Sequence, residues 1–86
     1  MSKESFYLYK INGASVEQMP GIGPAHGGRL ADNGYRKAAK LYGRYLLCDE
    51  DYASFKQFLA LHGVTYSNHR DNVYSTFRSW TEHHIG

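Results

Sequence analysis

The chain of 86 residues is long enough for one domain, near the lower size limit at which a hydrophobic core folds without help from disulfides, metals or oligomerisation. Cys48 is the single cysteine, which excludes an internal disulfide and favours a reducing compartment, and no segment reaches the roughly 20 apolar residues of a membrane span. The net charge is only +2, but Lys and Arg exceed the acids seven to three over residues 1–48, whereas the acids exceed them five to three over residues 49–86. A weak positive field in the first half would favour an anionic partner, although an ordinary solvated surface explains the charge equally well.

The first ten residues, MSKESFYLYK, contain an acid and alternate polar with aromatic groups, so they do not resemble a signal peptide. The five histidines lack the compact spacing of a zinc site with thiolates, so no metal is expected. We therefore expect a soluble intracellular domain, without a cofactor, that gains its remaining stability from oligomerisation.

Glycine and proline divide the first half into short helical units. Residues 5–11 are expected to form an aromatic-rich helix or an extended arm. Ser15 is expected to cap a brief helix over residues 15–19, which a proline then stops. The next helix is predicted over residues 24–33, with a proline at its first position and Gly34 as its C-terminal stop.

Helical spacing of apolar residues continues through the second half. A helix is predicted over residues 36–47, and the acids at 49–51 favour the start of another that Gly63 ends. Thr65 or Ser67 is expected to cap the last helix. The residues expected on the buried faces are Ala38, Leu41, Tyr42, Tyr45, Leu46, Tyr52, Phe55, Phe58, Leu59, His62, Val73, Tyr74, Phe77 and Trp80. No segment alternates as a strand does, so the predicted fold class is all-α, a compact bundle of five or six short helices.

Residues 19–30, MPGIGPAHGGRL, hold two prolines and four glycines and are interpreted as a tight turn between two helices. Gly21 and Gly23 lack Cβ, so they can adopt positive φ and let another group approach the backbone. Ile22 between them is expected to point back into the helix junction. The N–H groups of Gly21, Gly23 and Ala25 would then converge at a positive helix N-terminus, where an anion, most often a phosphate, binds.

Gly27 is small where the two helices must cross, and Leu30 returns to the core one turn later. This order over residues 16–33 is typical of a helix-hairpin-helix motif, which holds a DNA backbone phosphate without reading bases; the alternative is a tight turn that binds nothing. A GxxxxGK[ST] phosphate loop is absent, and a dinucleotide fold needs strands. The neighbouring polar residues of SNHRD, at 67–71, lie on one helix and form no catalytic triad, so we do not expect an enzyme.

Five blocks of the sequence together resemble the barrier-to-autointegration factor family over residues 16–82: GIGPAHGGRLADNGYRKA, LYGRYLL, DEDYASFKQFL, HGVT and FRSW. The resemblance implies a single domain over residues 1–86 with a SAM-like helical arrangement. It implies a homodimer that binds double-stranded DNA without sequence preference and bridges two duplexes. It also implies binding to LEM-domain proteins of the inner nuclear envelope, with roles in chromatin organisation and nuclear envelope assembly, and a location in the nucleus and also the cytoplasm.

The resemblance also implies roles for individual positions. The residues that it places at DNA are Lys3, Gly21, Ile22, Gly23, Ala25, Gly27, Arg29, Tyr66, Ser67 and Arg70. Those that it places near the dimer seam and the partner groove are Gly43, Tyr45, Leu46, Leu47 and Trp80.

The chain departs from the family at basic positions. Asp49 and Glu50 stand where the family usually has two lysines, and the basic pair in the second hairpin helix is reduced to Gly28 and Arg29. Each lost phosphate contact lowers the salt dependence of DNA binding by about 0.9 in log-log slope. A second hypothesis is therefore a protein-interaction paralogue that dimerises or binds LEM-domain partners with weak or no DNA binding. A third is an accessory hairpin domain of a repair enzyme, which would be monomeric alone.

Overall fold

The computed structural model describes residues 14–19 and 22–85, and within them the chain is all-helical. Its elements are the short 3-10 helix η2 (Val16–Gln18) and the α-helices α2 (Gly23–Asp32), α3 (Ala38–Leu47), α4 (Tyr52–Leu61) and α5 (Ser67–His84). The all-α prediction is confirmed. The predicted number of five or six helices is slightly off, since the described part has four α-helices and η2. The helix or arm predicted over residues 5–11 lies outside the described residues.

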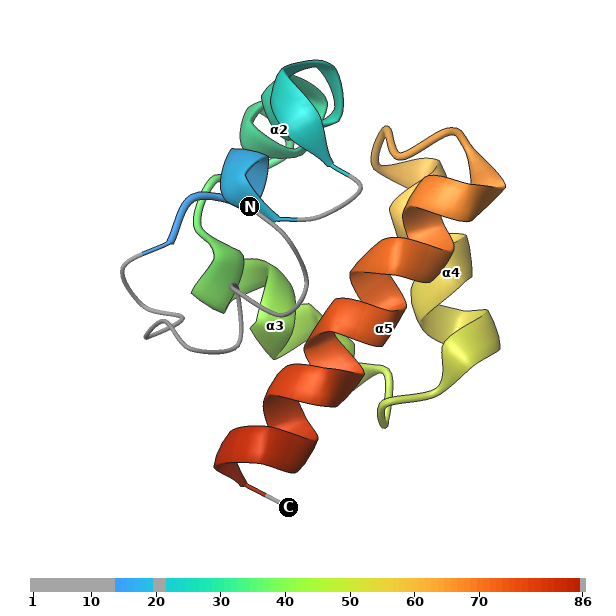
Figure 1. The fold of residues 1–86 in the computed structure, drawn as a ribbon. Helices are drawn as coiled ribbons and strands as arrows, with labels where there is room; N and C mark the ends of the chain where they lie inside the picture. Colours follow the sequence, from blue (N-terminus) through green and yellow to red (C-terminus); the bar gives the residue numbers. More distant parts are fainter. Residues whose placement is uncertain (1–13, 20–21, 86) are drawn as a thin grey trace.

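The long helix α5 runs through the molecule with α4 packed along it, while η2 packs on α2 (Figure 1). The first turn of α5 lies at the same end of the molecule as α2 (Figure 1). An isolated antiparallel bridge joins Ser15 to Lys37 and ties the start of η2 to the entry of α3. In the described segments, no helix combines the length and the apolar character needed to cross a membrane.

Local side-chain chemistry sets most of the helix boundaries. Ser15 and Gln18 form a reciprocal capping box at the start of η2, with Gln18 Oε1 accepting the Ser15 N–H at 2.8 Å. Asp51 caps α4 by accepting the Ser54 N–H at 2.9 Å. Gly34 follows α2 with φ of +90°. The cap predicted at Ser15 and the stop predicted at Gly34 are confirmed, and Asp51 supplies the negative charge expected at the start of α4.

One boundary prediction is wrong. Neither Thr65 nor Ser67 caps the last helix; its N-cap is Tyr66, whose extended backbone makes no side-chain capping bond. Asp49 and Glu50 lie before α4 and do not cap it. They form a left-handed turn after α3, with φ of 57° and 59°, so that only the following residue reaches the capping position.

The core is built from side chains of η2 and of all four α-helices. Its largest fully buried side chains are Tyr45, Phe55, Phe77, Leu30, Leu41 and Leu59. The predicted buried faces are confirmed at most positions, with exceptions at their edges. Leu46 and Tyr52 are each 44% exposed, because they lie one helical step outside the stripe that faces the core. Tyr74 and Trp80 are half-buried against its rim.

Candidate nucleic-acid interface

The turn before α2 is fixed by two buried apolar side chains and contains a glycine with positive φ. Met19 and Ile22 are 2% and 4% exposed, so their side chains fix the turn to the core. Gly23, the first residue of α2, has φ of +65°, a conformation that L side chains rarely adopt. No atom lies within 4 Å of a Cβ built there, so the backbone conformation and not crowding requires glycine. The predicted positive φ is confirmed for Gly23, whereas Gly21 lies outside the described residues.

The N-terminus of α2 carries uncompensated positive potential. Its first turn has no acidic residue, and the N-cap Ile22 makes no side-chain capping bond. The first N–H groups of a helix have no partner within it, and here they include those of Gly23 and Ala25. The helix dipole adds to their positive charge, so this end of α2 favours an anion.

Gly27 has a different role from the turn residues. It is buried where α2 crosses η2, and a Cβ at this position would lie 3.3 Å from the backbone Cα of Glu17. The predicted close crossing at Gly27 is confirmed. Gly27 therefore holds the two arms of the hairpin together instead of lining the groove described below.

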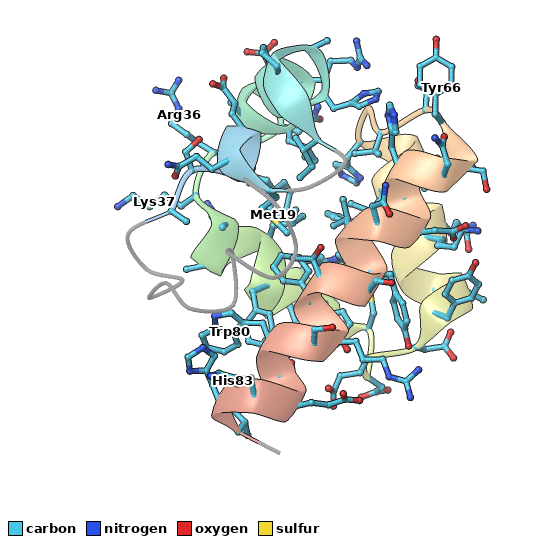
Figure 2. All side chains as sticks on the ribbon, viewed as in Figure 1. Met19, Arg36, Lys37, Tyr66, Trp80 and His83 are labelled. Carbon is cyan, nitrogen blue, oxygen red and sulfur yellow. The ribbon has the colours of Figure 1, made fainter. Side chains whose placement is uncertain are left out.

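A second uncapped N-terminus belongs to α5. Its N-cap, Tyr66, makes no side-chain capping bond, and its first turn, beginning at Ser67, has no acidic residue. Tyr66 is 62% exposed and projects from the end of α5 on the side of α2 (Figure 2). This N-terminus is therefore also electrostatically suited to an anion.

The two N-termini open onto one hollow of about 570 Å³, which we call the α2–α5 groove. It is lined by Ile22, Gly23, Pro24, Ala25, His26, Arg29, Thr65, Tyr66 and His69. Five of the residues that the resemblance places at DNA therefore line the same groove: Ile22, Gly23, Ala25, Arg29 and Tyr66. The first and the last of them are 44 positions apart in the sequence. Ser67 adjoins the groove as the residue after Tyr66. Gly27 and Arg70 are not among its lining residues, and Lys3 lies outside the described residues.

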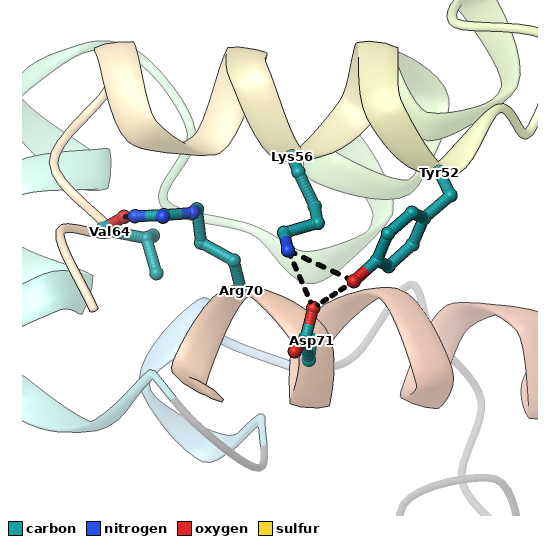
Figure 3. A network of polar contacts seen from close by, with 5 residues as sticks. All are labelled: Tyr52, Lys56, Val64, Arg70 and Asp71. Carbon is teal, nitrogen blue, oxygen red and sulfur yellow. Dashed lines mark hydrogen bonds and ion pairs between the residues drawn. The ribbon is translucent and has the colours of Figure 1, made fainter. Parts of the chain in front are cut away.

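Two arginines fix the loop between α4 and α5. Arg29 Nε donates to the Gly63 carbonyl at 2.8 Å, and Arg70 Nη1 donates to the Val64 carbonyl at 3.0 Å (Figure 3 shows Arg70). Gly63 has φ of +107°, and a Cβ there would lie 2.5 Å from the Cβ of Arg29. The guanidinium groups thus position the start of α5 beside α2, while their charge adds to the positive potential of that end.

A polar network anchors the second turn of α5 to α4 (Figure 3). Asp71 Oδ1 accepts from the Tyr52 hydroxyl at 2.6 Å and from Lys56 Nζ at 2.9 Å. The hydrogen bond from Tyr52, followed by that from Lys56, lowers the pKa of Asp71 below its ordinary value. The charge of Lys56 is therefore matched within the protein and contributes little to an anion in the groove.

The sequence reasoning missed the histidines of the groove. His26 is 4% exposed; its Nδ1 lies 3.0 Å from the Gly63 carbonyl oxygen and its Nε2 lies 2.9 Å from Nδ1 of His69. Burial lowers the pKa of His26. The sequence reasoning considered His26 and His69 only as possible metal ligands, and in the described part of the chain no three His, Cys, Asp or Glu residues cluster as a metal site would require. The available signal was their placement, since each lies within the first turn of a helix that the sequence predicted.

A second hollow, of about 410 Å³, lies between η2 and another face of α2. Its lining includes the carboxylates of Glu17 and Asp32 together with Arg36. Two carboxylates would repel a phosphate, so the α2–α5 groove is a better candidate for an anion site than this second hollow.

The residues assigned to the dimer seam lie at different depths. Tyr45 is only 1% exposed and packs among aromatic rings of α4 and α5, so its side chain supports that surface from inside instead of reaching a partner. Leu46 and Leu47 are 44% and 75% exposed at the end of α3. Gly43 and Trp80 are half-buried. The exposed apolar surface of this region is therefore formed by the two leucines.

Comparison with known proteins places this geometry in context. A family model described as "Barrier to autointegration factor" matches residues 2–84. The chain is similar to "Barrier-to-autointegration factor 1" of Caenorhabditis elegans, with 34% identity over 67 residues that cover 78% of this chain and 75% of the relative. It is also similar to "Barrier-to-autointegration factor" of Drosophila melanogaster, with 30% identity over 78 residues that cover 91% of this chain and 87% of the relative.

Proposed function

Because the chain belongs to the barrier-to-autointegration factor family, we propose that it is a non-enzymatic protein that binds double-stranded DNA through backbone phosphates. The observation that carries this proposal is the α2–α5 groove, where two helix N-termini without acidic first turns open onto one hollow. Helix N-termini are suited to phosphate oxygens. Contacts of this kind position a protein on the duplex but do not read its sequence, so binding is sequence-independent.

Each part of the groove has its own role in this proposal. The amides of Gly21, Gly23 and Ala25 bind one phosphate, and the start of α5 at Tyr66 and Ser67 contacts the backbone of the other strand. Supporting roles fall to Ile22 and Gly27, which hold the hairpin, and to Lys3, Arg29 and Arg70, which add positive charge.

The proposed assembly is a homodimer in which each protomer binds one duplex, so that the dimer bridges two DNA segments. The exposed leucines at the end of α3 and the small core of an 86-residue chain support a second copy as the partner. In this proposal the protein acts in the nucleus, in chromatin organisation and nuclear envelope assembly, and LEM-domain proteins bind across the dimer.

The decisive experiment places carboxylates at the phosphate site. The double variant Gly21→Glu, Gly23→Glu should lose duplex binding in a gel-shift assay, since the new charges occupy the anion position. Gly28→Glu is the control: it adds one carboxylate to α2 at a position with open space that does not line the groove. Circular dichroism confirms that each variant is helical. Unchanged binding by the double variant would contradict the proposal.

Salt dependence provides an independent measurement. The affinity should be similar for unrelated duplexes and should fall with a log-log slope of about −0.9 for each phosphate neutralised. A strong preference for one duplex sequence would contradict backbone recognition.

A second candidate function is a protein-interaction paralogue with weak or no DNA binding. It is favoured by the carbonyl bonds of Arg29 and Arg70, which occupy donors that a phosphate would use, and by the exposed Asp49 and Glu50 close to Leu47 in the chain. Light scattering during titration with duplex DNA at physiological salt separates the two functions. Tight binding with cross-linked complexes rejects this second candidate.

A further inference from the structure

A chain of three polar side chains crosses the α2–α5 groove from one helix to the other. Arg29 and His26 belong to α2, where His26 is buried, whereas His69 belongs to α5, is half-buried and lines the groove. Nη2 of Arg29 contacts Nδ1 of His26, and Nε2 of His26 lies 2.9 Å from Nδ1 of His69. The ring of Tyr66 packs edge-on against both histidine rings, with centroid distances of 5.9 and 5.4 Å, so the two rings are held in this arrangement.

The guanidinium of Arg29 determines which nitrogen of His26 carries the proton. A guanidinium only donates, so Nδ1 of His26 accepts from Nη2 and has no proton of its own. The Gly63 carbonyl oxygen lies 3.0 Å from the same Nδ1, but it accepts from Nε of Arg29 at 2.8 Å and not from the ring. Burial is the largest of the causes that lower the pKa of His26, which favours the neutral ring. The single proton of this ring is therefore on Nε2.

The same reasoning applied one step further determines the proton position of His69. Because Nε2 of His26 donates, Nδ1 of His69 accepts, and the proton of the His69 ring is on Nε2. Among the described residues, the bond to His26 is the only hydrogen bond of the His69 side chain. Since His69 lines the groove, its Nε2–H is available to a ligand that enters there.

We propose that His69 donates a neutral hydrogen bond from Nε2 to a DNA phosphate in the α2–α5 groove, and that Arg29 and His26 are the positioning residues that fix this donor. The opposite tautomer of His69 would present a lone pair, which repels a phosphate oxygen. Each hydrogen bond of the chain polarises the next, so Arg29 strengthens the donor although its own N–H groups are directed to Gly63 and His26. This inference rests on the proposed DNA binding and adds a ligand to that site.

The surroundings of His69 leave its donor to an anion from outside. No acidic residue is among the described residues that line the groove. The nearest carboxylate along α5 is that of Asp71, whose Oδ1 accepts from Tyr52 and Lys56 on α4 (Figure 3). Arg70 is directed to the Val64 carbonyl. The chain from Arg29 therefore ends at a donor for which the protein supplies no acceptor in its described part.

The experiment measures duplex affinity by fluorescence anisotropy at pH 8, where histidine side chains are ordinarily neutral, with EDTA to remove metal ions. His69→Leu removes both ring nitrogens and should weaken binding about tenfold, the loss expected for one hydrogen bond to a charged group. His69→Gln supplies an amide that can accept from His26 and donate to a phosphate, so it should keep most of the wild-type affinity. A loss in His69→Gln equal to that in His69→Leu would contradict the donor role.

His83→Leu is the matched control. His83 is exposed near the C-terminal end of α5, at the opposite end of that helix from Tyr66, so the same substitution there should leave duplex affinity unchanged (Figure 2). Equal affinity of wild type and His69→Leu would overturn the role of His69 while leaving the proposed DNA binding intact. A wild-type protein that binds no duplex would overturn both proposals.

The salt dependence separates a neutral donor from a charged one. A neutral donor releases no counterion, so wild type and His69→Leu should have the same log-log slope of affinity against salt. A slope that is shallower by about 0.9 in the variant would show that His69 neutralises a phosphate charge, which contradicts the proposal.

Nuclear magnetic resonance of the imidazole nitrogens tests the chain of hydrogen bonds without DNA. In the wild-type protein, His26 and His69 should each have a protonated Nε2 and an unprotonated Nδ1. A proton on Nδ1 of either ring would overturn the inference, whatever the affinities of the variants.

Discussion

An added Cβ should have opposite effects on stability at Gly63 and at Gly28. At Gly63 the backbone has φ of +107°, and a Cβ would lie 2.5 Å from that of Arg29. At Gly28, inside α2, nothing lies within 4 Å. We expect Gly63→Ala to lower the free energy of unfolding by about 1–3 kcal/mol, through strain and crowding. Gly28→Ala should raise it by roughly 0.5–1 kcal/mol, because alanine favours a helix.

Urea denaturation of both variants measures this contrast. A stable Gly63→Ala variant would show that the loop after α4 shifts freely, and Arg29 would then not fix the start of α5.

The residues of the candidate site were predictable where the signal is local. The spacing of glycine and proline around Ile22 requires a turn with positive φ, and Gly23 has it. The His26–His69 pair was not predictable, since its members are 43 positions apart and meet only because a loop brings two helix starts together. The burial of Tyr45 was predicted from its helical spacing, but the aromatic rings of α4 and α5 that cover it were not, because a position on a helix face does not reveal which neighbouring helix packs there.

At the scale of elements, the hairpin depends on the close crossing of η2 and α2. A Cβ at Gly27 would lie 3.3 Å from both Cα and Cβ of Glu17 and closer still to its Cγ. Gly27→Ala should therefore destabilise the protein by about 1–3 kcal/mol and weaken DNA binding, because the turn that presents the amides moves. Glu17→Ala removes the closest atom and should restore part of both losses. A double-mutant cycle in urea denaturation measures this coupling, and additive effects would contradict the packing argument.

The contact between α4 and α5 should respond to acid. Hydrogen bonds from Tyr52 and Lys56 lower the pKa of Asp71 below its model-compound value of 3.8. A depressed folded-state pKa contributes stability above the unfolded pKa, and this contribution is lost as the pH falls through the folded-state value. The melting temperature of wild type should therefore decline below about pH 4 more steeply than that of Asp71→Asn.

Asp32→Asn, which removes one carboxylate from α2 and leaves the α4–α5 contact intact, is the control for this comparison. It should follow the wild-type decline. Parallel curves for wild type and Asp71→Asn would show that the network in Figure 3 adds no pH-dependent stability.

Elements were predictable where a side chain marks the boundary. Ser15, Asp51 and Gly34 each determine a helix end by their own chemistry. The cap at Ser15 and the stop at Gly34 were predicted, whereas for Asp51 the sequence predicted only a negative charge near the helix start. The start of α5 was misplaced because Tyr66 becomes the N-cap without a capping side chain. The polar groups on either side of Tyr66 resemble caps in the sequence, but the loop geometry, and not a local hydrogen bond, selects where the helix begins.

At the scale of the whole molecule, DNA bridging requires two phosphate sites in one particle. One protomer has one α2–α5 groove, so a monomer holds one duplex through it. The groove is built from α2 and α5, whereas the exposed leucines lie at the end of α3. The groove and the leucine surface share no residue. A substitution at the leucines should therefore change dimerisation without changing the DNA contacts of the groove.

Leu47→Glu is the substitution that makes this separation. Leu47 is 75% exposed, so a charge there should be tolerated by the fold but should disrupt an apolar contact with a second copy. In sedimentation equilibrium at micromolar concentration, wild type should have about twice the 9.8 kDa chain mass, and Leu47→Glu should have the chain mass. The variant should still bind single duplexes but should no longer cross-link them in light scattering. Leu61→Glu is the matched control, because Leu61 is equally exposed at the end of α4 and should leave the dimer intact. A wild-type protein that sediments as a monomer would contradict bridging by a dimer, and bridging by a monomeric Leu47→Glu variant would contradict the role of α3 in it.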